Sequence, residues 1–392
     1  GDANSGGEFG PALKYAGYDA VFLSGISDKP VYIYIDDGKA EIRPADDLWG
    51  MDAIETEKTL QERHGDDVRV ACIGPAGEKL ALIAAIINDY GRAVGRSGVG
   101  AVMGSKRLKA VVARGDQPPT AAHPDQVKAL RSKYMPLFRT GETATILRDY
   151  GTAGVTKALS SIGRTPIKNW AGSYADGLLD FDGVDGPAVA KYEEKKYACW
   201  HCVQACGAIM RWETDGEQHE DHRPEYETLA LLGTACGIDD STFIMRLNEL
   251  CNRGGLDTIS AGSCVAFAME CFEKELLTEE QLDGLTLVWG DGEAALTLVE
   301  RIIQRDGLGD TLADGVQRAA QKLGQGSEAF AIHSGGQELP AHDPRQEADF
   351  GLVYQMSPTP GRHTQGGVAA YAKPEEELLA LGLDPTLAET DP

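Results

Sequence analysis

Three cysteines within eight residues constrain this chain more than any other feature. They are Cys199, Cys202 and Cys206, in the sequence CWHCVQAC with the spacing C-x2-C-x3-C. Thiolates held this closely bind a metal ion or an iron–sulfur cluster, and both kinds of site need four ligands. No second C-x2-C pair follows, although zinc sites usually have one. The triplet therefore favours a cubane [4Fe–4S] cluster with one distant fourth ligand, while zinc and unligated thiols remain open alternatives.

The remaining cysteines do not extend this cluster. Cys236, Cys251, Cys264 and Cys271 lie in helix-like apolar surroundings, which predicts that they are buried as small hydrophobic side chains. The cysteine spacing is not that of a secreted disulfide framework. We therefore expect a reducing compartment, the cytoplasm.

The formal net charge of the 392 residues is −24, which excludes several classes of partner. Phosphate backbones and anionic lipid surfaces are bound by clustered Lys and Arg, which such a charge balance does not provide. The apolar run ALIAAII at residues 81–87 is far too short to span a bilayer. We expect neither nucleic acid nor a membrane as a partner.

The first part of the chain has the pattern of a small sheet. Residues 31–35 and 39–43 flank Asp-Asp-Gly, which predicts a β-hairpin, and residues 69–73 and 108–112 are further strand candidates. One helix is predicted between them, from residue 52 to about residue 64.

Helical patterns dominate after the linker at residues 115–124. Asp240 or Ser241 begins a helix over residues 241–253, and Gly-Gly ends it. Other helices are expected at residues 125–139, 262–275, 292–305 and 310–323, and an irregular binding region at 333–367. The expected fold class is α+β. It divides into a β-rich domain at 1–118, an α-helical domain with the cysteine loop at 119–331, and the start of a second α-helical domain at 332–392.

The stretch GRAVGRSGVGAVMGSK at residues 91–106 is the second chemical motif. Its glycines let the backbone approach a ligand closely, and free N–H groups can hold phosphate. Arg92 and Arg96 add positive charge. The order Ser-Lys is the reverse of the P-loop's, and Met103 occupies the third glycine's place in the Rossmann fingerprint. We predict a phosphate-rich site of another design; a glycine-rich packing turn is the alternative.

Three further motifs are weaker when taken singly. RPEYE, which ends at Glu227, is more often a solvated helix start, and GLDTISAG at residues 255–262 is more often a capped turn. His363 in GRHTQGG can be a catalytic donor, although a lone surface histidine is the commoner case. The order in which all these motifs follow one another is more specific than any one of them.

In this order, the motifs resemble one family, the tungsten-containing aldehyde ferredoxin oxidoreductases. The resemblance runs nearly end to end, through NSGGEFGPALKYAGY, the glycine–arginine stretch, the cysteine triplet, PEYET, NELCNRGGLDT and ELPAHDPR. It implies a longer polypeptide on both sides of this chain. We expect the fourth cluster cysteine beyond Pro392, in a motif D-x-x-G-L-C. Cys236 or Cys251 as the fourth ligand is the alternative.

The resemblance also implies a set of cofactors. The β-rich domain would be the base for two pterin dithiolenes that hold one tungsten, and their phosphates would share Mg²⁺ near the backbone carbonyls of Asn4 and Ala93. Cys199, Cys202 and Cys206 would hold the [4Fe–4S] cluster. The other implied cofactor-binding residues are Arg92, Gly95, Arg96, Gly98, Gly100, Asn252, Asp257 and Thr258. Asn252 stands where the family often has Asp, and its carbonyl can still accept from pterin N–H groups.

The activity implied by the resemblance is the oxidation of aldehydes to carboxylic acids, with electrons passing through the cluster to ferredoxin. Glu227 would move the proton, Tyr226 would orient the substrate, and His363 would donate a hydrogen bond to its carbonyl oxygen. Two alternatives remain: a relative that reduces an aromatic acyl thioester at the same cofactor, and a non-catalytic iron–sulfur electron-transfer subunit. A homo-oligomer is compatible with each of these functions.

Overall fold

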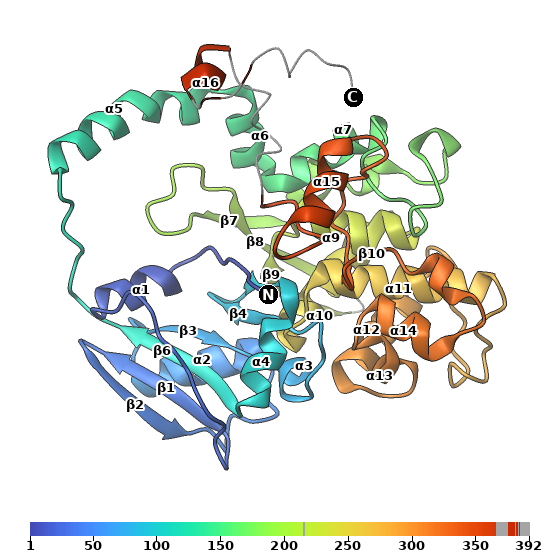
Figure 1. Cartoon of the computed structure of the whole chain (residues 1–392), viewed down its shortest axis with the longest axis horizontal. Helices are drawn as coiled ribbons and strands as arrows, with labels where there is room; N and C mark the ends of the chain where they lie inside the picture. Colours follow the sequence, from blue (N-terminus) through green and yellow to red (C-terminus); the bar gives the residue numbers. More distant parts are fainter. Residues whose placement is uncertain (215, 366–374, 381, 383, 385–392) are drawn as a thin grey trace.

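A six-stranded sheet and a larger helical part lie side by side in the computed structural model, as Figure 1 shows. The structure describes residues 1–392 except 215, 366–374, 381, 383 and 385–392. The strand order is β2-β1-β6-β3-β4-β5. The strands are β1 (Val31–Asp36), β2 (Lys39–Pro44), β3 (Arg69–Cys72), β4 (Ile86–Asn88), β5 (Arg92–Val94) and β6 (Leu108–Arg114). This sheet followed by helices confirms the α+β class.

The hairpin of β1 and β2 forms as predicted. Asp37 and Gly38 both have positive φ, 42° and 81°, which lets the chain reverse within two residues. β1 also pairs in parallel with β6, and its central side chains are buried on both faces of the sheet. Helix α2 (Ala53–His64) covers the sheet and begins where the Asp52 side chain accepts from the backbone N–H of Glu55 at 2.8 Å.

The glycine-rich stretch at residues 91–106 contains regular structure. It contains β5, a 3₁₀ turn (Arg96–Gly98) and helix α4 (Val99–Ser105). Gly98 has φ 65°, and a Cβ there would lie 2.2 Å from the carbonyl oxygen of Leu82. A Cβ on Gly100 would lie 2.4 Å from the carbonyl oxygen of Ala85. These two glycines therefore allow the turn to pack against the backbone of residues 82–85.

The helical part is built around α11 (Thr258–Glu273), which is buried along almost its whole length. Helix α10 (Ser241–Gly254) packs beside α12 (Gly292–Gln304), and Asp240 caps its first turn by accepting from Thr242 N at 2.8 Å. The other helices are α1 (Phe9–Tyr15), α3 (Pro75–Glu78), α5 (Pro124–Thr140), α6 (Glu142–Tyr150), α7 (Thr156–Ser161), α8 (Gly186–Ala190), α9 (Tyr226–Thr228), α13 (Leu308–Leu312), α14 (Val316–Leu323), α15 (Ala348–Met356) and α16 (Glu375–Ala380).

A second sheet lies within the region expected to be helical. It consists of β7 (Glu193–Tyr197), β8 (Gly207–Thr214) and β9 (Glu217–His222), all antiparallel. Buried and exposed residues largely alternate along β8, which is the strand period rather than the helix period. The cysteine triplet lies in the connection from β7 to β8. The metal-ligand motif therefore belongs to a hairpin and not to a loop between helices.

The region expected to be irregular, 333–367, also contains regular structure. Two short strands, β10 (His333–Ser334) and β11 (Gln337–Glu338), pair with each other, and α15 follows. Gly366 and Gly367 of the His363 motif lie outside the described residues. Among the helices that the structure describes, none combines the length and apolarity that a bilayer crossing requires.

Candidate functional site

A cavity of about 300 Å³ lies where the N-terminal sheet meets the helical part. Its walls come from β5, the turn that follows it, α9, α10, the start of α11 and the segment 362–364. Most of the predicted site residues meet here although they are far apart in sequence. The predicted residues that line the cavity are Asn4, Arg92, Ala93, Gly95, Arg96, Glu227, Asn252, Asp257, Thr258 and His363.

Three of the predicted catalytic and cofactor-binding residues do not line this cavity. Gly98 lies instead on a neighbouring cavity of about 280 Å³, and Gly100 is buried in the turn. Both are explained by the close backbone approach described above. The phenol of Tyr226 is 3% exposed; it donates to the carbonyl oxygen of Ala341 and lies 3.0 Å from Oγ1 of Thr165. The expected contact of Tyr226 with substrate is therefore not available in this geometry.

Tyr226 instead helps to fix the segment that carries a further histidine. The backbone N–H of Ala341 donates to Oε2 of Glu227 at 2.8 Å, while the carbonyl of the same residue accepts from Tyr226. His342 follows directly, and its ring stacks on Phe350 with the centroids 4.8 Å apart. Two neighbouring residues of α9 thus clamp one residue of the distant segment.

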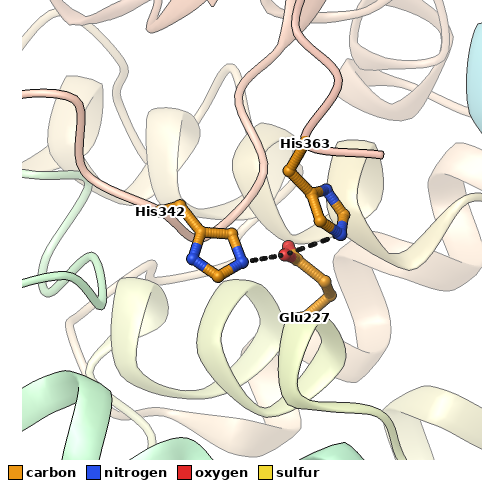
Figure 2. A group of neighbouring side chains, drawn as sticks. All are labelled: Glu227, His342 and His363. Carbon is orange, nitrogen blue, oxygen red and sulfur yellow. Dashed lines mark ion pairs between the residues drawn. The ribbon is translucent and has the colours of Figure 1, made fainter. Parts of the chain in front are cut away.

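Glu227, His342 and His363 point toward one another from three separate segments, as Figure 2 shows. Nε2 of His342 lies 3.4 Å and Nε2 of His363 lies 3.6 Å from Oε1 of Glu227. All three ligand atoms lie within 4.8 Å of one another, a donor set that a zinc-type cation could also use. Sequence reasoning missed His342. The motif ELPAHDPR contains it, but nothing in the sequence indicates that it reaches Glu227.

Burial governs the charges of this trio. Burial raises the pKa of Glu227, and the neighbouring His342 opposes that rise. Burial likewise lowers the pKa of His342, and burial together with Arg96 and Arg362 lowers the pKa of His363 to about 4. Both imidazoles are therefore neutral at pH 7. Oε1 of Glu227 has no hydrogen-bond partner among the described residues and is available as a base.

Arg92 and Arg96, two of the four arginines that line the cavity, have donors without a hydrogen-bond partner among the described residues. Nε and Nη2 of Arg92, and Nε and Nη1 of Arg96, are buried without a hydrogen-bond partner in the described part of the chain. The other Nη of Arg96 donates to the carbonyl oxygens of Glu338 and Gly361 at 2.6 and 3.1 Å, which holds its guanidinium in place. Buried donors of this kind need an acceptor, and phosphate groups suit the guanidinium fork. The cavity thus fits a phosphorylated, anionic ligand.

The cysteine loop lies next to this cavity. A Cβ on Gly6 would lie 3.0 Å from Sγ of Cys199, and the backbone N–H of Trp200 donates to Gly7 O at 3.3 Å. The three thiols are free, with Cys202 exposed and the other two partly buried. Arg92 joins the two regions: it lines the cavity, and the charges of Cys199 and Cys206 act on it.

The arrangement of the thiols is more open than a zinc site. Around a tetrahedral zinc ion the sulfurs lie about 3.8 Å apart, given Zn–S bonds of about 2.3 Å. The three sulfurs are not among the described groups whose ligand atoms all lie within 4.8 Å. The geometry of the free thiols thus differs from that of a zinc site, and the [4Fe–4S] assignment of this loop stays a prediction. Cys236, Cys251, Cys264 and Cys271 are all buried, as predicted.

The fold and the site together place the chain in a class of proteins in which an arginine-lined cavity adjoins a loop of three thiols. The chain belongs to the aldehyde ferredoxin oxidoreductase family. Residues 1–115 match the family's "N-terminal domain", and residues 129–387 match its "domains 2 & 3".

Several relatives support this assignment. The tungsten-containing aldehyde ferredoxin oxidoreductases of Pyrococcus furiosus and Thermococcus kodakarensis are 40% and 39% identical to 92% of this chain. A "WOR-like subunit" of an aliphatic sulfonate oxidoreductase from P. furiosus is 34% identical over 91% of the chain. The chain spans 59–60% of the length of these relatives.

A solved structure also matches. It is the active-site complex BamBC of benzoyl coenzyme A reductase with 1,5-dienoyl-CoA, which superposes with a TM-score of 0.80 at 28% identity. The match covers 97% of this chain and 60% of the other.

Proposed function

We propose that the protein to which this chain belongs oxidises aldehydes to carboxylic acids at a tungsten bis-pterin centre and passes the electrons to ferredoxin through a [4Fe–4S] cluster. One observation carries the proposal: a buried carboxylate with a free oxygen, Oε1 of Glu227, lies between two neutral histidines at a cavity whose arginines have unpaired donors. The 40% identity to tungsten-containing aldehyde ferredoxin oxidoreductases supports the same reaction.

The residues that would hold the cofactor follow from the cavity. Arg92 and Arg96 would donate to its phosphates, and Asn4 and Ala93, which also line the cavity, would bind Mg²⁺ through their backbone carbonyls. Asn252, Asp257 and Thr258 line the side formed by the helical part. Asp257 also caps α11 by accepting from Ile259 N at 3.1 Å, so its position is fixed. Cys199, Cys202 and Cys206 would hold the cluster.

The protein's own groups then have definite tasks. Oxidation of an aldehyde with one water gives a carboxylic acid, two electrons and two protons. The bound tungsten centre supplies the two-electron acceptor. Oε1 of Glu227 accepts a proton as the water oxygen bonds to the carbonyl carbon. Neutral His363 donates Nε2–H to the carbonyl oxygen and polarises it. His342 keeps Glu227 oriented from the opposite side.

One observation supports a second candidate reaction. The structural match to benzoyl coenzyme A reductase suggests reduction of an aromatic acyl thioester at the same cofactor. The higher identity to the aldehyde enzymes and the PEYET segment with Glu227 favour aldehyde oxidation.

The test uses the full-length protein purified without air. Tungsten, iron and pterin are quantified, and reduction of a viologen dye is followed with acetaldehyde. Benzoyl-CoA with a reduced dye is assayed in parallel. We expect tungsten and iron together and dye reduction by the aldehyde. Activity with the thioester alone would support the second reaction, and iron without tungsten would leave only an electron-transfer subunit.

A further inference from the structure

A buried carboxylate lies directly behind the cavity wall. Asp221, the penultimate residue of β9, is 6% exposed. Two amides of α10 donate to it: Nδ2 of Asn248 at 2.7 Å, and Nδ2 of Asn252 at 3.1 and 2.9 Å to its two oxygens. Asn248 and Asn252 are one helical turn apart, so both reach the same carboxylate. Asp221 itself does not line the cavity, whereas both asparagines do.

This contact determines which way the Asn252 amide faces. A side-chain amide has a donor end and an acceptor end, and a carboxylate can only accept. The NH₂ group of Asn252 must therefore face Asp221, and Oδ1 must face the other way. In the described part of the chain, no donor contacts this Oδ1, and it is not among the fully buried atoms that lack a partner. It is the acceptor that Asn252 presents to the cavity.

The surroundings of Asp221 indicate that orientation, not charge pairing, is its role. The groups that act on it most are the backbone N–H of His222, the two amides and the charge of Glu249, and none of these is positive. Burying a carboxylate without a cation is costly. Burial raises the pKa of Asp221 to about 7. Even a protonated carboxyl keeps a carbonyl oxygen that accepts from the Asn252 amide.

We propose that Asp221 is a positioning residue, which fixes the Asn252 amide so that Oδ1 accepts a hydrogen bond from the N–H edge of a pterin in the cavity. The proposal rests on the proposed function, because it needs the pterin. It also explains why Asn252 can stand where the resemblance leads us to expect Asp. The carboxyl group is that of Asp221, behind the cavity wall, and Oδ1 of Asn252 is the neutral acceptor that faces the cavity.

The test exchanges the two residues. In Asp221→Asn, two amides face each other and nothing holds Asn252 in one orientation. In Asn252→Asp, two carboxylates lie in contact. The double variant Asp221→Asn/Asn252→Asp restores one donor–acceptor contact and again leaves one oxygen for the cavity. Glu270→Gln is the matched control, because Glu270 is likewise a carboxylate that accepts from a buried amide, Nδ2 of Asn169 at 2.6 Å, outside the cavity.

The readouts are pterin and tungsten per polypeptide after gel filtration, the rate of pterin loss, and the melting temperature. We expect each single variant to lose pterin roughly tenfold faster than the wild type, as loss of one hydrogen bond predicts. The double variant should return to within about threefold of the wild type by the same measure. Glu270→Gln should lower the melting temperature and leave pterin retention unchanged.

Two results would overturn the proposal. One is wild-type pterin retention in Asp221→Asn. The other is a double variant that loses pterin as fast as the worse single variant. The tungsten and pterin content of the wild-type protein distinguishes these two results from a failure of the proposed function. If the wild type holds neither tungsten nor pterin, the cofactor assignment itself is wrong.

Discussion

The two neighbouring regions of the site are built in opposite ways. The Glu227 region is enclosed: its three side chains are only 14–28% exposed and come from segments distant in sequence. The cysteine loop is a surface hairpin connection whose middle thiol, Cys202, is exposed. Proton transfer requires a base kept from bulk water, whereas electron exit requires a group near the surface. In the proposed reaction, proton transfer and electron exit would therefore take place in opposite environments, and Arg92 lies at their boundary.

The largest expected effect comes from the exposed region. Cys202→Ala in the full-length protein should abolish the cluster, because a [4Fe–4S] cluster needs its four ligands. We expect loss of cluster iron and of ferredoxin-linked turnover, measured by iron analysis and by electron paramagnetic resonance of the reduced protein. Tungsten should stay bound, since the cavity is a separate region.

Cys264→Ala is the matched control, because it removes a buried thiol outside the loop. It should lower the melting temperature while the iron content stays unchanged. An intact cluster signal in Cys202→Ala would show that this thiol is not a ligand, and the contrast between the two regions would lose its chemical basis.

The next largest effect concerns the enclosed region. Glu227→Gln keeps the shape but cannot accept a proton, so aldehyde-dependent dye reduction should fall by about 10²–10⁴-fold. Tungsten and iron contents should match the wild type. The pH profile sharpens the test. Since burial raises the pKa of Glu227, the wild-type rate should rise with pH through a value above the usual one of about 4.3.

That acid limb should disappear in Glu227→Gln, because the variant has no carboxyl to ionise. A limb that persists unchanged would assign the titration to another group. Unchanged turnover would remove Glu227 from the reaction.

A smaller effect is expected from His342, which touches Glu227 but does not line the cavity. The neighbouring His342 opposes the rise in the pKa of Glu227, so His342→Gln should let that pKa rise further. The acid limb of kcat should then move to higher pH, and the rate at a fixed pH on that limb should fall. KM for the aldehyde should change little. His123→Gln, an exposed histidine before α5, is the control.

Local features of the fold were predictable from the sequence, whereas contacts across it were not. The hairpin at β1 and β2, the capped helix α10 and the buried cysteines follow from turn residues, caps and apolar periodicity. The β7–β9 sheet was missed because a charged strand such as EEKKY has no apolar alternation.

The same division holds within the candidate site. The resemblance selected residues that do meet at one cavity, such as Arg96 and Asn252. It could not give the direction of the Tyr226 phenol or the approach of His342 to Glu227. Both depend on where the segment around Ala341 packs, which no local pattern encodes. The role of Asp221 was not predicted for the same reason, because its contacts with Asn248 and Asn252 join two elements distant in sequence.

The smallest effect is expected from a change at the start of α10, which lies outside both the Glu227 region and the cysteine loop. Asp240 caps α10, the helix that carries Asn252, by accepting from Thr242 N. Asp240→Ala should cost about 1 kcal/mol of unfolding free energy, a shift in melting temperature of about 2 °C or less in a chain of this size. Asp240→Asn keeps an acceptor and should stay close to the wild type. Neither variant should change the iron or tungsten content, because the cap lies at the far end of α10 from Asn252. A fall in the iron or tungsten content of the folded Asp240→Ala protein would mean that the first turn of α10 is coupled to the site. The Glu227 region and the cysteine loop would then depend on this part of the helix.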